Sequence, residues 1–192
     1  SPAYEAPVPV ICIGNINAGG TGKTPTVIAL TQRLTDNGIA VHVVTRGYGG
    51  ALTGPVQVDP VAHTADETGD EPLLVAAFAP TWVAKDRAAG VQAAVAAGEE
   101  VIVLDDGHQN PAVRKDLSIV VVDAVKGFGN MRVLPGGPLR EPVDAGLARA
   151  DFLLAIRGAR QRAGFSPTLP TTCTRVNGHL PPPPAGLPWA AT

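Results

Sequence analysis

The sequence predicts an α/β fold in which a mostly parallel sheet is flanked by helices. Short apolar runs alternate with stretches of helical periodicity, a pattern typical of parallel strands joined by helical crossovers. Hydrophobic residues make up 45% of the 192 residues and aromatic residues only 4%, so the core is expected to be aliphatic. A chain of this length is expected to form one domain of ordinary size.

The first elements form a strand–helix–strand unit. The mostly β-branched run at 8–13 is typical of a buried strand, and a glycine-rich loop follows it at 14–22. Apolar residues with helical spacing begin after Thr24, and Gly38 ends that helix, since glycine is favoured just past a helix C-terminus. The apolar run at 40–44 is the next predicted strand.

The later elements continue the alternation. Strands are expected at 56–58, 101–104, 117–122 and 152–156, and helices at 71–79, 87–97 and 143–149. Loops rich in glycine and proline separate them at 46–55 and 127–142. After Arg157 the pattern gives way to a proline-rich segment. We therefore expect a folded domain over 1–157 and an extended C-terminal linker or arm over 158–192.

Composition and charge exclude several classes of function. The net charge is −2 and charged residues make up 17%, so we expect no nucleic-acid partner. Cys12 and Cys173 form neither a disulfide framework nor a metal motif, and Cys12 lies in an apolar run typical of a buried, inert thiol. No apolar run approaches 18 residues, so we expect this stretch of chain to be soluble.

The loop at 14–24, with the sequence GNINAGGTGKT, is the clearest functional signal. It lies between a predicted strand and a predicted helix, the context of a phosphate-binding P-loop. Glycines let backbone N–H groups converge on phosphate oxygens, and the helix N-terminus adds partial positive charge. Lys23 would contact the β- and γ-phosphates of ATP, and the Thr24 hydroxyl would bind Mg²⁺. The expected nucleotide-binding residues are Gly19, Gly20, Thr21, Gly22, Lys23 and Thr24; Asn17 replaces the usual first glycine.

Two adjacent carboxylates support this interpretation. Asp105 ends an apolar strand, which is where P-loop proteins carry the carboxylate that supports Mg²⁺. Adjacent strand residues face opposite ways, so Asp106 shares the site only if the strand has ended, which Gly107 allows. The alternative for both residues is a solvated turn.

With further motifs in place, the chain resembles the tetraacyldisaccharide 4′-kinase family, the lipid A 4′-kinases of Gram-negative bacteria. The motifs are, in order, GN at 14–15, GGTGKTP at 19–25, TRGYGG at 45–50, TGDEP at 68–72, KDR at 85–87, DDGHQ at 105–109 and LPGGPLREP at 134–142. The resemblance runs from about residue 8 to at least residue 157. The family's P-loop also lacks glycine at the position of Asn17.

The resemblance implies a lipid kinase that uses ATP and Mg²⁺. The γ-phosphate of ATP would pass to the 4′-hydroxyl of a tetraacylated glucosamine disaccharide 1-phosphate, the lipid A precursor. It implies catalytic roles for Lys23, Asp70 and Asp106, with Asp70 as the base, and Mg²⁺ binding by Thr24 and Asp105. Other matched active-site positions are Arg46, Tyr48, Arg87, Gln109, Arg140 and Glu141. The arginines would pair with phosphate.

The resemblance also has consequences outside this stretch of sequence. Family members have a hydrophobic N-terminal helix that seats them on the membrane surface, and a second lobe that supplies a histidine partner for the base. We expect this chain to be the nucleotide-binding portion, with an incomplete active site, of a protein at the cytoplasmic face of the bacterial inner membrane. The family commonly has Phe-Gln-His where this chain has His108, Gln109 and Asn110, which leaves the role of His108 open.

Structural alternatives stay open for several of these residues. Asp70 could be the N-cap of a helix that continues with Glu71, itself a first-turn partner of the helix dipole. Tyr48 could be a packing residue in its glycine-rich loop. Arg87 could be a solvated surface charge, and Arg140 with Glu141 could form an exposed ion pair of little energetic value.

Two other functions compete with the lipid kinase. One is a P-loop ATPase of the partitioning type, which carries a lysine directly before the Gly-Gly pair. Ala18 holds that position here, which argues against this class. The other is a nucleotide-binding module without catalytic activity.

Overall fold

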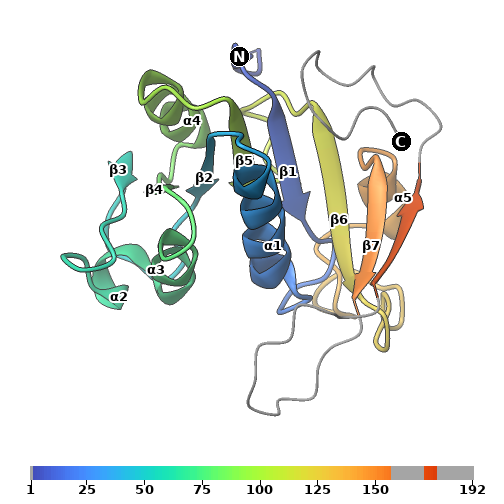
Figure 1. Ribbon diagram of the computed structural model, residues 1–192. Helices are drawn as coiled ribbons and strands as arrows, with labels where there is room; N and C mark the ends of the chain where they lie inside the picture. Colours follow the sequence, from blue (N-terminus) through green and yellow to red (C-terminus); the bar gives the residue numbers. More distant parts are fainter. Residues whose placement is uncertain (1, 157–170, 177–192) are drawn as a thin grey trace.

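The computed structural model describes residues 2–156 and 171–176. These residues form one eight-stranded sheet with the order β3-β4-β2-β5-β1-β6-β7-β8 (Figure 1). The strands are β1 (Val10–Gly14), β2 (Val41–Thr45), β3 (Val56–Gln57), β4 (Thr81–Val83), β5 (Val101–Asp105), β6 (Leu117–Asp123), β7 (Phe152–Ile156) and β8 (Thr171–Arg175). Neighbours from β4 to β7 are parallel, and the two edge strands are antiparallel. The predicted fold class is confirmed.

Helices cover both faces of this sheet (Figure 1). They are α1 (Lys23–Asp36), α2 (Ala65–Thr68), α3 (Asp70–Ala76), α4 (Arg87–Ala96) and α5 (Val143–Leu147). Buried residues of α1 and α3 share one apolar core with the sheet, while α4 and α5 belong to two cores on the other side. Of the helices in the described part of the chain, none combines the length and hydropathy that a bilayer span requires.

The alternation of side chains along β1 explains why both faces are apolar. Ile11 and Ile13 pack in the core with α1, whereas Val10 and Cys12 pack in the core with α4. A strand buried on both faces needs a continuous apolar run, which is what the sequence has here. Burial raises the pKa of the Cys12 thiol to about 12, so the prediction of a buried, inert cysteine is confirmed.

The structure adds three elements that the sequence patterns did not predict. β4 has only three residues and α2 only four, too few for a periodic pattern to stand out. Thr171–Arg175, which we expected to be part of an extended linker, forms β8 and pairs with β7. The threonines in that strand favour extended backbone. Within 158–192, all residues but 171–176 lie outside the described residues. The division of the chain at residue 157 therefore stays a prediction.

The order of the strands gathers distant motifs at one edge. β1 and β2 are not neighbours, because β5 lies between them and pairs with both. The carboxyl ends of the parallel strands therefore bring together Gly14, Thr45 and Asp105, followed by the P-loop, the TRGYGG loop and the second aspartate. In open α/β sheets, ligands bind outside the carboxyl ends of the strands.

Candidate active site

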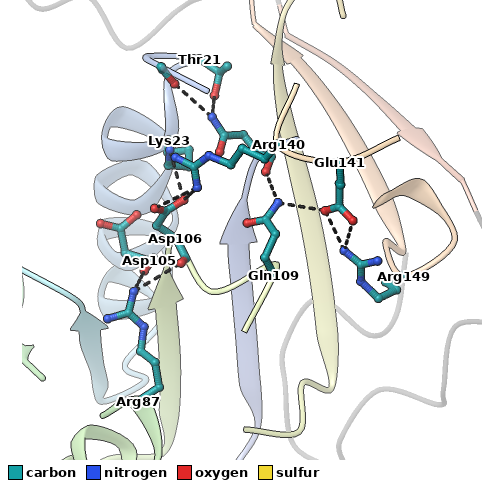
Figure 2. Close-up of polar contacts among 11 residues, drawn as sticks. Thr21, Lys23, Arg87, Asp105, Asp106, Gln109, Arg140, Glu141 and Arg149 are labelled. Carbon is teal, nitrogen blue, oxygen red and sulfur yellow. Dashed lines mark hydrogen bonds and ion pairs between the residues drawn. The ribbon is translucent and has the colours of Figure 1, made fainter. Parts of the chain in front are cut away.

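The P-loop turns from β1 into α1 through two glycines in the left-handed region. Gly19 has φ 113° and Gly22, directly before α1, has φ 94°. The side-chain amide of Asn15 donates to the Gly19 carbonyl (3.0 Å) and to Thr21 Oγ1 (3.2 Å), as Figure 2 shows for Thr21. These contacts fold the loop around its own backbone and place Lys23 at the start of the helix.

Asn17 ties the P-loop to the glycine- and proline-rich loop at 127–142. Its side-chain amide donates to the Gly127 carbonyl at 3.2 Å, and its backbone forms an isolated bridge with Leu139. The Ala18 amide donates to the Pro138 carbonyl at 2.7 Å. The residue that replaces the usual glycine therefore provides a link that glycine lacks.

Asp106 is the centre of a charged cluster beside the P-loop (Figure 2). Its Oδ1 lies 3.3 Å from Lys23 Nζ and 3.0 Å from Arg140 Nη1. Asp106 has φ 55°, so the strand has ended and its side chain leaves the alternation of β5. Burial opposes ionisation, but Lys23 and Arg140 outweigh it and lower the pKa of Asp106. The residue is a carboxylate at neutral pH.

Asp105 is held in a different environment from its neighbour. Its side chain is buried at 2% exposure, and burial raises its pKa to about 6, with Glu71 and Asp106 adding like-charge repulsion. Lys23 and Arg87 oppose this shift. Among the described residues, Oδ1 of Asp105 has no hydrogen-bond partner. A buried carboxylate oxygen without a partner is a suitable ligand for a cation such as Mg²⁺.

Arg87 supports the turn that carries both aspartates. It is 3% exposed, and its guanidinium donates to the carbonyls of Ala84 (3.2 Å), Asp105 (3.2 Å) and Asp106 (3.3 Å). The alternative of a solvated surface charge is wrong. α4 starts at Arg87, and the Arg87 side chain is buried against the end of β5. Its two Nη atoms donate to main-chain carbonyls, so this arginine holds the backbone of Asp105 and Asp106 in place.

A cavity of about 570 Å³ opens between the P-loop and α3. The P-loop, the aspartate turn and the loop at 127–142 contribute Ala18, Gly19, Gly20, Lys23, Asp106 and Arg140. The other side contributes Tyr48, Asp70 and Glu71. The three residues to which the resemblance assigns catalytic roles, Lys23, Asp70 and Asp106, thus all line this one cavity.

The residues on the α3 side rule out two of the structural alternatives. Tyr48 is 90% exposed, so the packing interpretation is wrong. Asp70 is the first residue of α3 and the N-cap is Gly69 at φ 93°, so Asp70 is not the cap. Gly69 takes that position because its backbone passes against the Tyr48 carbonyl, where a Cβ would clash. Asp70 and Glu71 both lie in the first turn of α3, where Glu71 was expected as a partner of the helix dipole.

Gln109 and Glu141 belong to a second network beside the cavity (Figure 2). The Gln109 amide donates to the Asn15 carbonyl at 2.7 Å and to Glu141 Oε1 at 2.9 Å. Glu141 in turn pairs with Arg149, while Arg140 pairs with Asp106. The alternative of an Arg140–Glu141 ion pair is therefore wrong; the two side chains point to different partners.

The remaining predicted residues lie near the cavity but not in its wall. Thr21 is a buried residue of the P-loop, Gly22 is the N-cap of α1, and Thr24 is the second residue of that helix. Arg46 follows β2 and is exposed.

No group of three or more His, Cys, Asp or Glu side chains that could hold a metal occurs within residues 2–156 and 171–176. A cation here would thus rely on Asp105, the Thr24 hydroxyl, phosphate oxygens and water.

His108 has a structural place in this region. It is 2% exposed, its Nε2 lies 2.9 Å from the Gly146 carbonyl, and its Cβ packs against Gly14.

The sequence patterns missed Asn15 and Arg149 as members of the site. Asn15 lies inside a motif that carried a signal, whereas Arg149 follows a short helix with no recognisable motif.

Together, the parallel sheet, the P-loop and the strand-end aspartates define a protein of the P-loop nucleotide-binding class. The profile of the tetraacyldisaccharide-1-P 4′-kinase family matches residues 1–183. The chain belongs to this family.

Individual relatives agree with this assignment. The chain is 62% identical over 191 residues to the tetraacyldisaccharide 4′-kinase of Dinoroseobacter shibae, which covers 98% of this chain and 57% of that protein. It is 59% identical to the enzyme of the same name from Jannaschia sp., over 97% of this chain and 58% of that protein. The chain thus spans little more than half the length of these relatives.

A solved structure provides the same comparison in three dimensions. LpxK from Aquifex aeolicus in complex with ATP superposes with a TM-score of 0.71 at 30% sequence identity. The match covers 81% of this chain and 56% of that one. The fold of the described residues is therefore the fold of that family.

Proposed function

We propose that this chain is the nucleotide-binding part of a kinase that phosphorylates the 4′-hydroxyl of tetraacyldisaccharide 1-phosphate in lipid A biosynthesis. The observation that carries the proposal is the cavity that joins Lys23 and Asp106 at the P-loop to Asp70 on α3. Family membership and the ATP bound to the Aquifex aeolicus relative support ATP as the donor.

The P-loop side is suited to hold ATP and Mg²⁺. Backbone amides of Gly19 to Gly22 and the N-terminus of α1 provide the donors and partial charge that phosphates need. Lys23 is placed to contact the β- and γ-phosphates. Thr24 and the unpartnered Oδ1 of Asp105 would hold Mg²⁺, which, when bound, neutralises charge on the phosphate oxygens.

Transfer needs positioning and charge neutralisation more than covalent chemistry by the protein. Asp70 would accept the proton of the 4′-hydroxyl as its oxygen attacks the γ-phosphorus, and ADP would leave. Lys23 and Arg140 lie across the cavity from Asp70 and carry positive charge toward the transferred group. Asp106 keeps these two cations together, and Arg87 holds the Asp105–Asp106 turn from behind.

The acceptor is a lipid, so the reaction belongs at a membrane surface. We place the complete protein at the cytoplasmic face of the inner membrane of a Gram-negative bacterium, where ATP is present. This location rests on the resemblance and on the chemistry of the two substrates.

The test is transfer of ³²P from [γ-³²P]ATP to tetraacyldisaccharide 1-phosphate by the complete protein that contains this chain. We expect a doubly phosphorylated lipid product, formed with the wild type and lost with Lys23→Ala. ATP hydrolysis without any lipid product would contradict the kinase assignment and favour another P-loop ATPase. ATP binding with neither product would favour a non-catalytic nucleotide-binding module.

A further inference from the structure

Arg149 contacts both carboxylate oxygens of Glu141 beside the P-loop (Figure 2). Its Nη2 lies 2.7 Å from Oε1 and 2.6 Å from Oε2 of Glu141. Its Nη1 donates to the Ala145 carbonyl in α5 at 2.9 Å. The arginine therefore fastens the end of the loop at 127–142 to the helix that follows it.

Glu141 connects Arg149 to the phosphate-binding residues through Gln109. Gln109 donates to Glu141 Oε1 and, with the same nitrogen, to the Asn15 carbonyl at the base of the P-loop. Asn15 then donates to the Gly19 carbonyl and to Thr21 Oγ1. A continuous chain of hydrogen bonds leads from Arg149 to the loop that would surround the phosphates.

The same contact influences the charged cluster. Arg140 is the neighbour of Glu141 in sequence, and it pairs with Asp106 beside Lys23. Fixing Glu141 fixes the backbone from which Arg140 extends. Burial raises the pKa of Glu141, but hydrogen bonds from Arg149 and Gln109 outweigh it and lower the pKa, so Glu141 is a carboxylate at neutral pH.

We propose that Arg149 is a positioning residue that sets the geometry of the phosphate-binding loop through Glu141 and Gln109. The proposal rests on the proposed nucleotide-binding function and adds a residue that touches neither the cavity wall nor the P-loop itself. An exposed ion pair alone contributes little, but Arg149 also bonds the Ala145 carbonyl, and the Glu141 carboxylate also accepts from Gln109, so the contact restricts three side chains at once.

The chain offers a matched control for this arginine. Arg114 forms a single 3.3 Å contact with Glu5, and both side chains are largely exposed. The Arg114 backbone amide donates to the Tyr4 carbonyl of the amino-terminal segment at 2.9 Å, and its side chain takes no part in the networks described above. Arg114→Met removes an arginine–glutamate pair of the same type without touching the site.

The experiment measures the Kd of Mg²⁺-ATP by calorimetry on the complete protein, without lipid acceptor. We expect Arg149→Met to weaken ATP binding about tenfold, the loss typical of a charge-assisted hydrogen bond. Arg149→Lys keeps the charge but lacks the second nitrogen that donates to the Ala145 carbonyl, and should recover part of the affinity. Arg114→Met should bind ATP like the wild type.

A double variant tests the route of the effect. If Arg149 acts through Gln109, Arg149→Met should weaken ATP binding much less in a Gln109→Ala background than in the wild type. Equal losses in both backgrounds would overturn the proposed route. A lower melting temperature of Arg149→Met with unchanged ATP affinity would mean a structural role only and would also overturn it. Failure of the wild type to phosphorylate lipid would count against the kinase assignment alone, because ATP binding is measured separately.

Discussion

On the P-loop side of the cavity, Lys23 and Arg140 both pair with Asp106, whereas on the α3 side Tyr48, Asp70 and Glu71 are exposed. The first side is organised before any ligand arrives, because its charges already contact one another. The second side presents side chains at the surface of short loops and a helix start. Preorganised charge suits the phosphates, whose position must be fixed, while the α3 side suits an acceptor that has to enter and leave.

The largest effect is expected on the P-loop side. Lys23→Ala removes the cation that neutralises the transferred phosphoryl group, and we expect kcat/KM for lipid phosphorylation to fall by about 10³-fold or more. Steady-state ³²P transfer by the complete protein measures this. Lys126→Ala, an exposed lysine at the start of the neighbouring loop, should keep wild-type activity. Normal turnover by Lys23→Ala would refute the P-loop assignment.

The next effect is expected on the α3 side. Asp70→Asn keeps the shape of the side chain but accepts no proton, so kcat should fall by about 10²-fold or more while the Kd of ATP stays unchanged. Single-turnover transfer and calorimetry separate the two quantities. Asp66→Asn, an exposed aspartate in α2, is the matched control. Parallel losses of kcat and ATP affinity would mean that Asp70 supports the fold of the site.

A smaller effect concerns stability rather than rate. Because burial raises the pKa of Asp105 to about 6, the folded protein binds a proton more tightly than the unfolded chain, and wild-type stability falls as pH rises from about 4 to 6. Asp105→Asn removes this penalty, so at pH 7.5 the metal-free variant should be more stable by roughly 3 kcal/mol.

Chemical denaturation with a chelator present checks this prediction at several pH values. The gain in the free energy of unfolding should shrink below pH 6 and vanish well below the unfolded pKa of 3.8, where the folded and the unfolded wild type both carry the proton. A gain that is the same at all pH values would show that the carboxylate charge is not its cause.

The smallest effect is expected for Tyr48. Because this side chain is 90% exposed, Tyr48→Ala should change the free energy of unfolding by less than about 0.5 kcal/mol. The same denaturation experiment measures it. A loss of several kcal/mol, as for a buried aromatic side chain, would remove the contrast between the two sides of the cavity.

Patterns with a local cause could be predicted from the sequence. The β-branched run of β1, the glycines of the P-loop and the aspartate at the end of β5 each depend on a few neighbouring residues, and each was found where expected. Short elements such as β4 could not be predicted, because three residues carry no periodicity and pairing with β2 makes them a strand.

The roles of individual charges were harder to predict, because a charge alone does not name its partner. From the sequence alone Arg87 could equally be solvated, but in the fold it contacts the Ala84 carbonyl after β4 and the two carbonyls at the end of β5. Arg140 and Glu141 are adjacent in sequence and of opposite charge, yet they pair with Asp106 and Arg149 instead.

By itself the sequence determined the α/β class, the phosphate-binding loop and the family, since these depend on composition, spacing and motifs that fold locally. Only the tertiary structure decided which charges meet. Inserting β5 between β1 and β2 brings Asp105 and Asp106 beside Lys23. The return of the loop at 127–142 brings Arg140 to Asp106 and Glu141 to Gln109. Contacts across about 30 to 80 residues of sequence depend on the order of the strands and the path of the loops, which no local pattern encodes.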